Sequence, residues 1–128
     1  GGGNIVMINT MVTRVPMPTQ AGYGASKAAL ASATAHMAKE LGPYNIRVNS
    51  AYMGWMWGPP VQSYFEQQAQ ATGRPIEELK AEVAQNIPLR RIPDDSECAK
   101  AAIFLASDYS TVITGAALDV NGGEYIPH

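Results

Sequence analysis

The sequence predicts an α/β fold in which a parallel sheet is flanked by helices. Short apolar runs of the kind that form strands alternate along the chain with longer segments whose apolar residues recur at helical spacing. Glycine and proline residues separate these segments. Such alternation is typical of parallel sheets, because a crossover between two parallel strands needs a connection about as long as a helix.

Three segments are expected to form strands. Ile5–Ile8 is a continuous apolar run, which indicates a strand buried on both faces. Asn45–Ala51 is the second candidate, and Ala117–Val120, followed by Asn121-Gly122-Gly123, is the third. Because three strands are few for a sheet with helices on both faces, we expect one open sheet edge and one face without full helical cover.

The longest helix is expected at residues 21–41, after a loop at residues 9–22 that contains two prolines. Its core-facing residues recur at i, i+4, i+7 and i+11, which places them on one face: Leu30, Thr34, Met37 and Leu41. We expect Gly42 to end this helix as a C′ glycine, with Pro43 after it.

Three further helices are expected in the second half of the chain. One spans residues 61–72 and is broken by Gly73, and the next begins near Pro75 and runs to Pro88. The apolar stripe of this second helix is Ile76, Leu79, Val83 and Ile87. The third starts at a capping sequence, Pro93–Glu97, and continues to about Ser107.

The composition excludes several classes of function. The chain has 128 residues and a net charge of −2 without a clustered basic face, so nucleic acid is not an expected partner. No apolar run reaches the roughly 20 residues that span a bilayer, and a single cysteine, Cys98, fits a reducing compartment. We therefore expect a cytoplasmic protein. His36 and His128 have no neighbouring cluster of ligands, so no metal is expected.

The motif that carries chemistry is Tyr23-Gly24-Ala25-Ser26-Lys27. Residues four apart on a helix point the same way, and an ammonium beside a phenol favours the phenolate. Such a phenol can exchange a proton with an alcohol or carbonyl oxygen. Thr10 ends the first expected strand 13 positions before Tyr23, and its hydroxyl could bond the same oxygen. Taken alone, this motif is often only a solvated pair.

The residues around the motif resemble the short-chain dehydrogenase/reductase family. The resemblance runs from Ile5 to Gly123 and rests on segments in a fixed order: the strand to Thr10, Tyr23–Leu30, Glu40-Leu41-Gly42, Ile46–Asn49, Thr114-Gly115 and Leu118–Gly123. It implies a Rossmann-like NAD(P)-binding domain, of which residues 1–128 form only the C-terminal part, about three strands. It also implies that residues 59–93 form a substrate-loop or lid insertion.

The resemblance assigns three catalytic residues. Tyr23 matches the general acid/base of the family, and Lys27 matches the lysine that binds the nicotinamide ribose and tunes the tyrosine. Thr10 stands where the family has its catalytic serine, a departure that keeps the hydroxyl. The implied reaction transfers a hydride between NAD or NADP and a small carbonyl or alcohol substrate.

The loop after the second strand is implied to border cofactor and substrate. Met53-Gly54 replaces the usual Pro-Gly of the family, and Gly58 stands where a threonine often contacts the carboxamide. The expected cofactor contacts are Tyr23, Lys27, Met53, Gly54, Trp55 and Met56. With Thr10, Trp55 and Trp57 are expected to line the substrate pocket, although simple loop packing is the alternative for both tryptophans.

Two hypotheses remain open from the sequence. Gly1-Gly2-Gly3 precedes a strand, whereas a phosphate-binding turn follows one and opens a helix. The chain is therefore expected to lack the dinucleotide cradle and to have little activity alone. The first hypothesis is an oxidoreductase, expected to be a homodimer or homotetramer. The second is a truncated, non-catalytic half-domain that acts as an assembly partner, which the alanine-rich residues 28–38 would suit.

Overall fold

The computed structural model describes residues 1–127, so His128 and its expected lack of a role lie outside the described residues. Three strands and four α-helices alternate along the chain: β1 (Gly3–Thr10), α1 (Ala21–Leu41), β2 (Ile46–Met53), α2 (Pro59–Thr72), α3 (Ile76–Gln85), α4 (Asp95–Ala106) and β3 (Ala117–Val120). The α/β fold expected from the sequence is confirmed, and the bounds of α1 and β3 are the expected ones.

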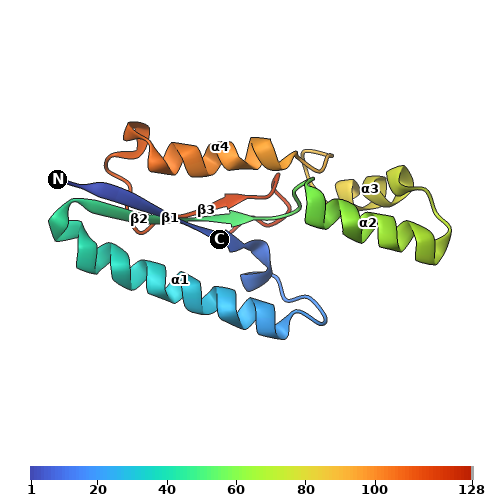
Figure 1. The fold of residues 1–128 in the computed structure, drawn as a ribbon, viewed down its shortest axis with the longest axis horizontal. Helices are drawn as coiled ribbons and strands as arrows, with labels where there is room; N and C mark the ends of the chain where they lie inside the picture. The colour runs from blue at the N-terminus through green and yellow to red at the C-terminus, as the bar shows by residue number, and fades with distance from the viewer. Residues whose placement is uncertain (128) are drawn as a thin grey trace.

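The three strands form one parallel sheet in the order β1-β2-β3. Figure 1 shows α1 on one face of this sheet and α4 on the other, with α2 and α3 lying beyond the carboxyl ends of the strands. Thr10, Met53 and Val120 are aligned in neighbouring strands. All three strands therefore end at one edge, where ligands bind in open parallel sheets.

One expectation about the sheet is wrong. β1 is an edge strand and not one buried on both faces, and its Ile8 side chain is 46% exposed. β2 is the buried strand, because β1 and β3 flank it and helices cover both of its faces. Each face of the sheet carries one long helix (Figure 1), but Ile8 on β1 is exposed, so the helical cover is incomplete there. The expected open edge is confirmed at β1.

Helix ends differ from expectation where proline is involved. Gly42 has φ −54°, in the right-handed helical region, so it is not the left-handed C′ residue that was expected. Pro43 fits the first turn of a helix, and the chain continues as a 3₁₀ turn until Asn45 takes the left-handed conformation at φ 59°. α3 ends at Gln85, before Ile87, because the residue preceding Pro88 disfavours helical torsions.

The core between the sheet and α4 is small and apolar. Its buried members are Ala51, Met53, Cys98 and Leu105, with Val6, Met56, Ile113 and Val120 packed against them. The α4 N-terminus carries a capping box between Asp94 and Glu97, as the sequence indicated. No helix within residues 1–127 is both long and apolar enough to cross a membrane.

Candidate active site

Thr10 lies at the carboxyl end of β1. Its backbone N–H donates to Asn9 Oδ1 over 2.8 Å, and its Oγ1 accepts from the backbone N–H of Val12 over 3.3 Å. Because that bond uses only an oxygen lone pair, the hydroxyl hydrogen of Thr10 is left to donate elsewhere. The buried Met11 starts the 3₁₀ turn that follows. The strand end therefore presents a hydroxyl donor.

Tyr23 and Lys27 lie in the first two turns of α1. The Lys27 Nζ is 5.9 Å from the centroid of the Tyr23 ring, so the two side chains share one face, as their spacing predicts. Lys27 Nζ also donates to the backbone oxygen of Ile8 over 3.3 Å. The ammonium is thereby held at β1, two residues before Thr10, while the Tyr23 side chain remains 48% exposed.

Asn9 is a site residue that the sequence did not reveal. Asn9 is only 2% exposed, and its side-chain Nδ2 donates to the backbone oxygen of Lys27 over 3.1 Å. Its Oδ1 accepts from the backbone N–H of Thr10. One buried amide therefore joins the strand end to the helix. Its signal in the sequence is weak: an amide residue placed directly before the candidate hydroxyl.

A cavity of about 210 Å³ opens beside Thr10. Among the predicted site residues, Thr10, Met53, Gly54 and Trp55 line it. Its other lining residues, which were not predicted, are Met11, Val12, Met17, Gln20 and Val61. Tyr23 and Lys27 are not part of this lining, and Lys27 contacts β1 two residues before Thr10.

Met56 and Trp57 do not line this cavity. Met56 packs on the core beneath α4. Trp57 forms a parallel bridge with Asp94, in which its backbone N–H donates to Pro93 over 2.7 Å. The Lys80 ammonium lies 3.9 Å from the Trp57 ring centroid. Within the described residues, these contacts favour the packing alternative for Trp57, whereas Trp55 lines the cavity.

Two glycines near the cavity are required by close approach. A Cβ on Gly54 would lie 2.7 Å from the Cβ of Asn121 and 3.2 Å from its Cα. This distance is too short for any side chain, so the turn after β2 packs directly on the turn after β3. A Cβ on Gly58 would lie 2.6 Å from Asp95 Oδ2, which explains why the threonine frequent at this position in the family does not fit here without a shift of Asp95.

The ionic contacts near the site are structural. Arg14 Nε is 3.0 Å from Asp119 Oδ1, and its guanidinium stacks 4.2 Å from the centroid of the Tyr52 ring. This contact ties the segment after Thr10 to β3. Burial raises the pKa of the Cys98 thiol, so the thiol stays protonated and is a poor nucleophile. No cluster of three or more His, Cys, Asp or Glu residues suited to a metal occurs among residues 1–127.

The described contacts therefore place the Lys27 ammonium beside the Tyr23 ring and at the β1 backbone, and the Thr10 hydroxyl beside a cavity at the end of the same strand. A protein with these groups can bind an oxygen atom and exchange a proton with it. This is the chemistry that the sequence motif indicated.

Comparison with known proteins agrees with the α/β fold described above. A family model described as enoyl-(acyl carrier protein) reductase matches residues 1–124. The chain is 36% identical over 121 residues to the 3-oxoacyl-acyl-carrier-protein reductase of Chlamydia trachomatis, covering 94% of this chain and 44% of that protein. The chain belongs to the short-chain dehydrogenase/reductase family.

Solved members of the family share the architecture. The short-chain dehydrogenase family protein of Francisella tularensis superposes with a TM-score of 0.88 at 30% identity, covering 94% of this chain and 50% of that one. The L-sorbose reductase of Gluconobacter frateurii, solved with NADPH and L-sorbose, superposes with a TM-score of 0.91 at 28% identity, covering 97% of this chain and 48% of that one. The chain thus spans about half the length of the relatives it matches.

Within this short-chain dehydrogenase/reductase chain, the Arg47-Val48-Asn49 segment that supported the resemblance has a structural role. Arg47 Nη1 and Nη2 donate to four acceptors at the end of α4 and beyond: Leu105 O, Ser107 O, Ile113 O and Ser110 Oγ. Asn49 donates to Ile113 O and accepts from the Ala116 N–H. The segment holds the α4–β3 connection and does not reach the candidate site.

Proposed function

We propose that Tyr23, Lys27 and Thr10 form the proton-transfer group of an NAD(P)-dependent oxidoreductase. The proposed reaction moves a hydride between the nicotinamide and the carbon of a small carbonyl or alcohol substrate. The observation that carries the proposal is the position of Lys27: its Nζ contacts the backbone of β1 at Ile8 and lies 5.9 Å from the Tyr23 ring centroid. Family membership supports the same reaction class.

The residues of this chain fit the ribose end of such a cofactor. An ammonium has three N–H donors, and Lys27 uses one of them on Ile8 O, so two remain for ribose hydroxyls. Met53 ends β2, and Gly54 and Trp55 follow it at the same edge; these three residues are the proposed neighbours of the nicotinamide. Met56 packs on the core, which weakens its expected cofactor role. Bound NADH or NADPH would supply the hydride.

Each side chain has one task in the proposed reduction. The Thr10 hydroxyl donates to the carbonyl oxygen and holds it in place. The Tyr23 phenol then gives its proton to that oxygen as the carbon receives the hydride, which yields the alcohol. The Lys27 ammonium favours the phenolate that remains. In the reverse direction the same phenolate takes the proton from the alcohol.

The phosphates of the dinucleotide would need another binding element. Gly3 opens β1, so the glycines at residues 1–3 precede a strand and do not start a helix. This position supports the expectation that the chain alone binds the cofactor weakly. A test of activity therefore uses a protein in which this chain is joined to a dinucleotide-binding half.

Residues 59–93 are proposed to act as a lid over the substrate. The Trp57 N–H donates to Pro93 O, which brings the two ends of this segment together. The chain therefore leaves the sheet before α2 and returns close to the same point after α3. Figure 1 shows this helix pair beyond the carboxyl ends of the strands, the side on which the cavity lies.

A second candidate function, assembly without catalysis, is favoured by the outer surface of α1. Its exposed small residues include Ala28, Ala29, Ala33 and Ala35. A homodimer or homotetramer through this surface is compatible with either function. Titration of the chain with NADH and NADPH, followed by fluorescence, tests the second candidate: micromolar binding contradicts a purely assembling role.

The function itself is tested by carbonyl-dependent oxidation of NADH or NADPH, with two variants of Thr10. Thr10→Ser keeps the hydroxyl, and we expect it to keep most of the turnover. Thr10→Val keeps the shape and removes the donor, which is expected to lower kcat by about 100-fold. If no carbonyl compound stimulates cofactor oxidation, or if the valine variant equals the serine variant, the proposal is wrong.

A further inference from the structure

The cavity beside Thr10 is apolar on most of its surface. Six of its lining side chains are apolar: Met11, Val12, Met17, Met53, Trp55 and Val61. Thr10 and Gln20 are the polar members, and no charged side chain lines it. The nearby Arg14 is already paired with Asp119. Nothing in this lining would compensate a buried charge, which is costly to desolvate alone.

Methionine is unusually frequent in this lining. The chain has six methionines, and Met11, Met17 and Met53 line this one cavity. Methionine is unbranched and adapts its shape, so a surface rich in it accepts apolar groups of differing outline. Met11 and Met53 are buried, at 7% and 5% exposure, and form the floor, whereas Met17 is exposed at the rim.

Trp55 forms one wall of this cavity and packs against aromatic side chains of α2. Its ring centroid lies 5.7 Å from that of Phe65 and 6.0 Å from that of Tyr64, both on α2. Trp55 also lines a second cavity, of about 250 Å³, between α2 and α3. The indole therefore separates the cavity at Thr10 from the interior of the helix pair.

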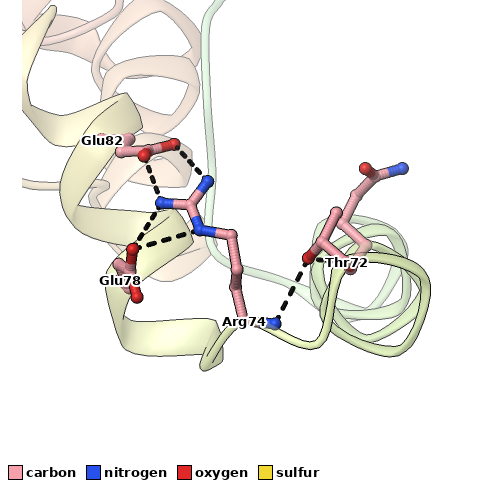
Figure 2. Close-up of polar contacts among 5 residues, drawn as sticks. Thr72, Arg74, Glu78 and Glu82 are labelled. Carbon is pink, nitrogen blue, oxygen red and sulfur yellow. Dashed lines mark hydrogen bonds and ion pairs between the residues drawn. The ribbon is translucent and has the colours of Figure 1, made fainter.

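The helix pair behind Trp55 is braced at its turn. Figure 2 shows the Arg74 guanidinium between Glu78 and Glu82, with the Arg74 backbone N–H reaching Thr72 Oγ1. The Arg74 Nη2 to Glu78 Oε1 distance is 2.7 Å. These surface contacts join the turn after α2 to α3.

We infer that this cavity binds the uncharged, apolar group next to the reacting carbonyl, and that Trp55 sets the size of group accepted. The inference rests on the proposed function and narrows it to apolar ketones and alcohols. A carboxylate or phosphate at the same place would lie among methionine and indole side chains, and no cationic side chain belongs to the lining.

Binding can be measured without any cofactor, because the chain has only two tryptophans. In Trp57→Phe the emission reports Trp55, and in Trp55→Phe it reports Trp57. The probes are isopropyl methyl ketone and pyruvate, in which a carboxylate replaces the isopropyl group of the ketone. We expect a saturable change with the ketone in Trp57→Phe, little change in Trp55→Phe, and at least about tenfold weaker binding of pyruvate.

Three outcomes would overturn the inference: no saturable response to the ketone, equal responses in the two variants, or equal or tighter binding of pyruvate. Circular dichroism confirms that both variants are folded. Failure here differs from failure of the proposed function. An enzyme that transfers hydride but prefers the charged ketone contradicts only the inference, whereas ketone binding at Trp55 without any hydride transfer contradicts the proposed function.

Discussion

Asn9 Nδ2 donates to the backbone oxygen of Lys27 over 3.1 Å, so the buried side chain at the end of β1 is bonded to the helix turn that carries the candidate ammonium. The other end of the same amide accepts from the Thr10 N–H over 2.8 Å. One buried side chain therefore links Thr10 to the turn of Lys27, and this relationship can be tested by substitution.

Asn9→Ala is expected to lower the free energy of unfolding by about 1–3 kcal/mol, because it leaves buried backbone groups without their partner. Urea denaturation followed by circular dichroism measures the change. Asn4→Ala is the matched control: Asn4 lies on the same strand and donates to Ala106 O over 2.9 Å, but it is exposed. Asn9→Asp should fall between, since it keeps the bond to Thr10 and loses the donor. Equal costs at positions 4 and 9 would contradict this role for Asn9.

Gly122 and Gly42 should respond oppositely to alanine. Gly122 has φ +65°, and a Cβ there would lie 2.6 Å from Ile87 Cγ2, so Gly122→Ala is expected to cost about 2 kcal/mol or more. Gly42 is helical at φ −54° with nothing within 4 Å of a new Cβ, so Gly42→Ala is expected to be neutral or stabilising by up to about 1 kcal/mol. A tolerated Gly122→Ala in thermal denaturation would show that the turn after β3 is packed differently.

Arg47 should contribute more to stability than the surface arginine Arg74. Arg47→Met leaves the acceptors at the end of α4 without a donor, and we expect a loss of about 2–3 kcal/mol in urea denaturation. Arg74→Met serves as the control, because its partners Glu78 and Glu82 are on the surface and remain hydrated. The account is contradicted if Arg74→Met is the more destabilising of the two.

The Arg91–Glu97 pair predicts a pH dependence of stability. The hydrogen bonds from Arg91, and then that from the Asp94 N–H, lower the pKa of Glu97. A carboxyl with a lowered pKa in the folded state adds stability above its unfolded pKa, and this stability is lost as the pH falls through the folded value.

The advantage of the wild type over Glu97→Gln should therefore be largest near neutral pH and shrink between about pH 5 and pH 3. Arg91→Met should reduce the same dependence, while the bond from the Asp94 N–H keeps part of it. Denaturation midpoints measured across this range check both variants. A stability advantage of the wild type over Glu97→Gln that grows toward acid pH would contradict this role of the pair.

Local patterns predicted much of the fold. The bounds of α1 and β3 were correct because alanine-rich periodicity and the Asn-Gly-Gly turn are encoded within the segments themselves. The capping box at Asp94 and Glu97 is equally local. The order of the strands is not, since an apolar run suits either an edge or a central position. This is why Ile5–Ile8 was wrongly expected to be buried on both faces.

The candidate site, like the fold, has features that local sequence predicts and features that depend on distant contacts. The shared face of Tyr23 and Lys27 follows from helical spacing alone, and it was predictable. The hydrogen bond from Asn9 to Lys27 and the different surroundings of Trp55 and Trp57 depend on contacts between distant segments, such as that of Trp57 with Pro93. Two tryptophans separated by one residue look alike in a sequence until tertiary packing separates them.

The most direct measurement compares turnover of Tyr23→Phe with that of Tyr44→Phe, each in the protein joined to a dinucleotide-binding half. Both substitutions remove one hydroxyl from an exposed tyrosine, but Tyr44 lies in the turn after α1 at the opposite end of the helix from Tyr23. Removal of the Tyr23 hydroxyl is expected to lower kcat by about 100- to 10,000-fold, while Tyr44→Phe stays near the wild type. Near-normal turnover of Tyr23→Phe would contradict the account.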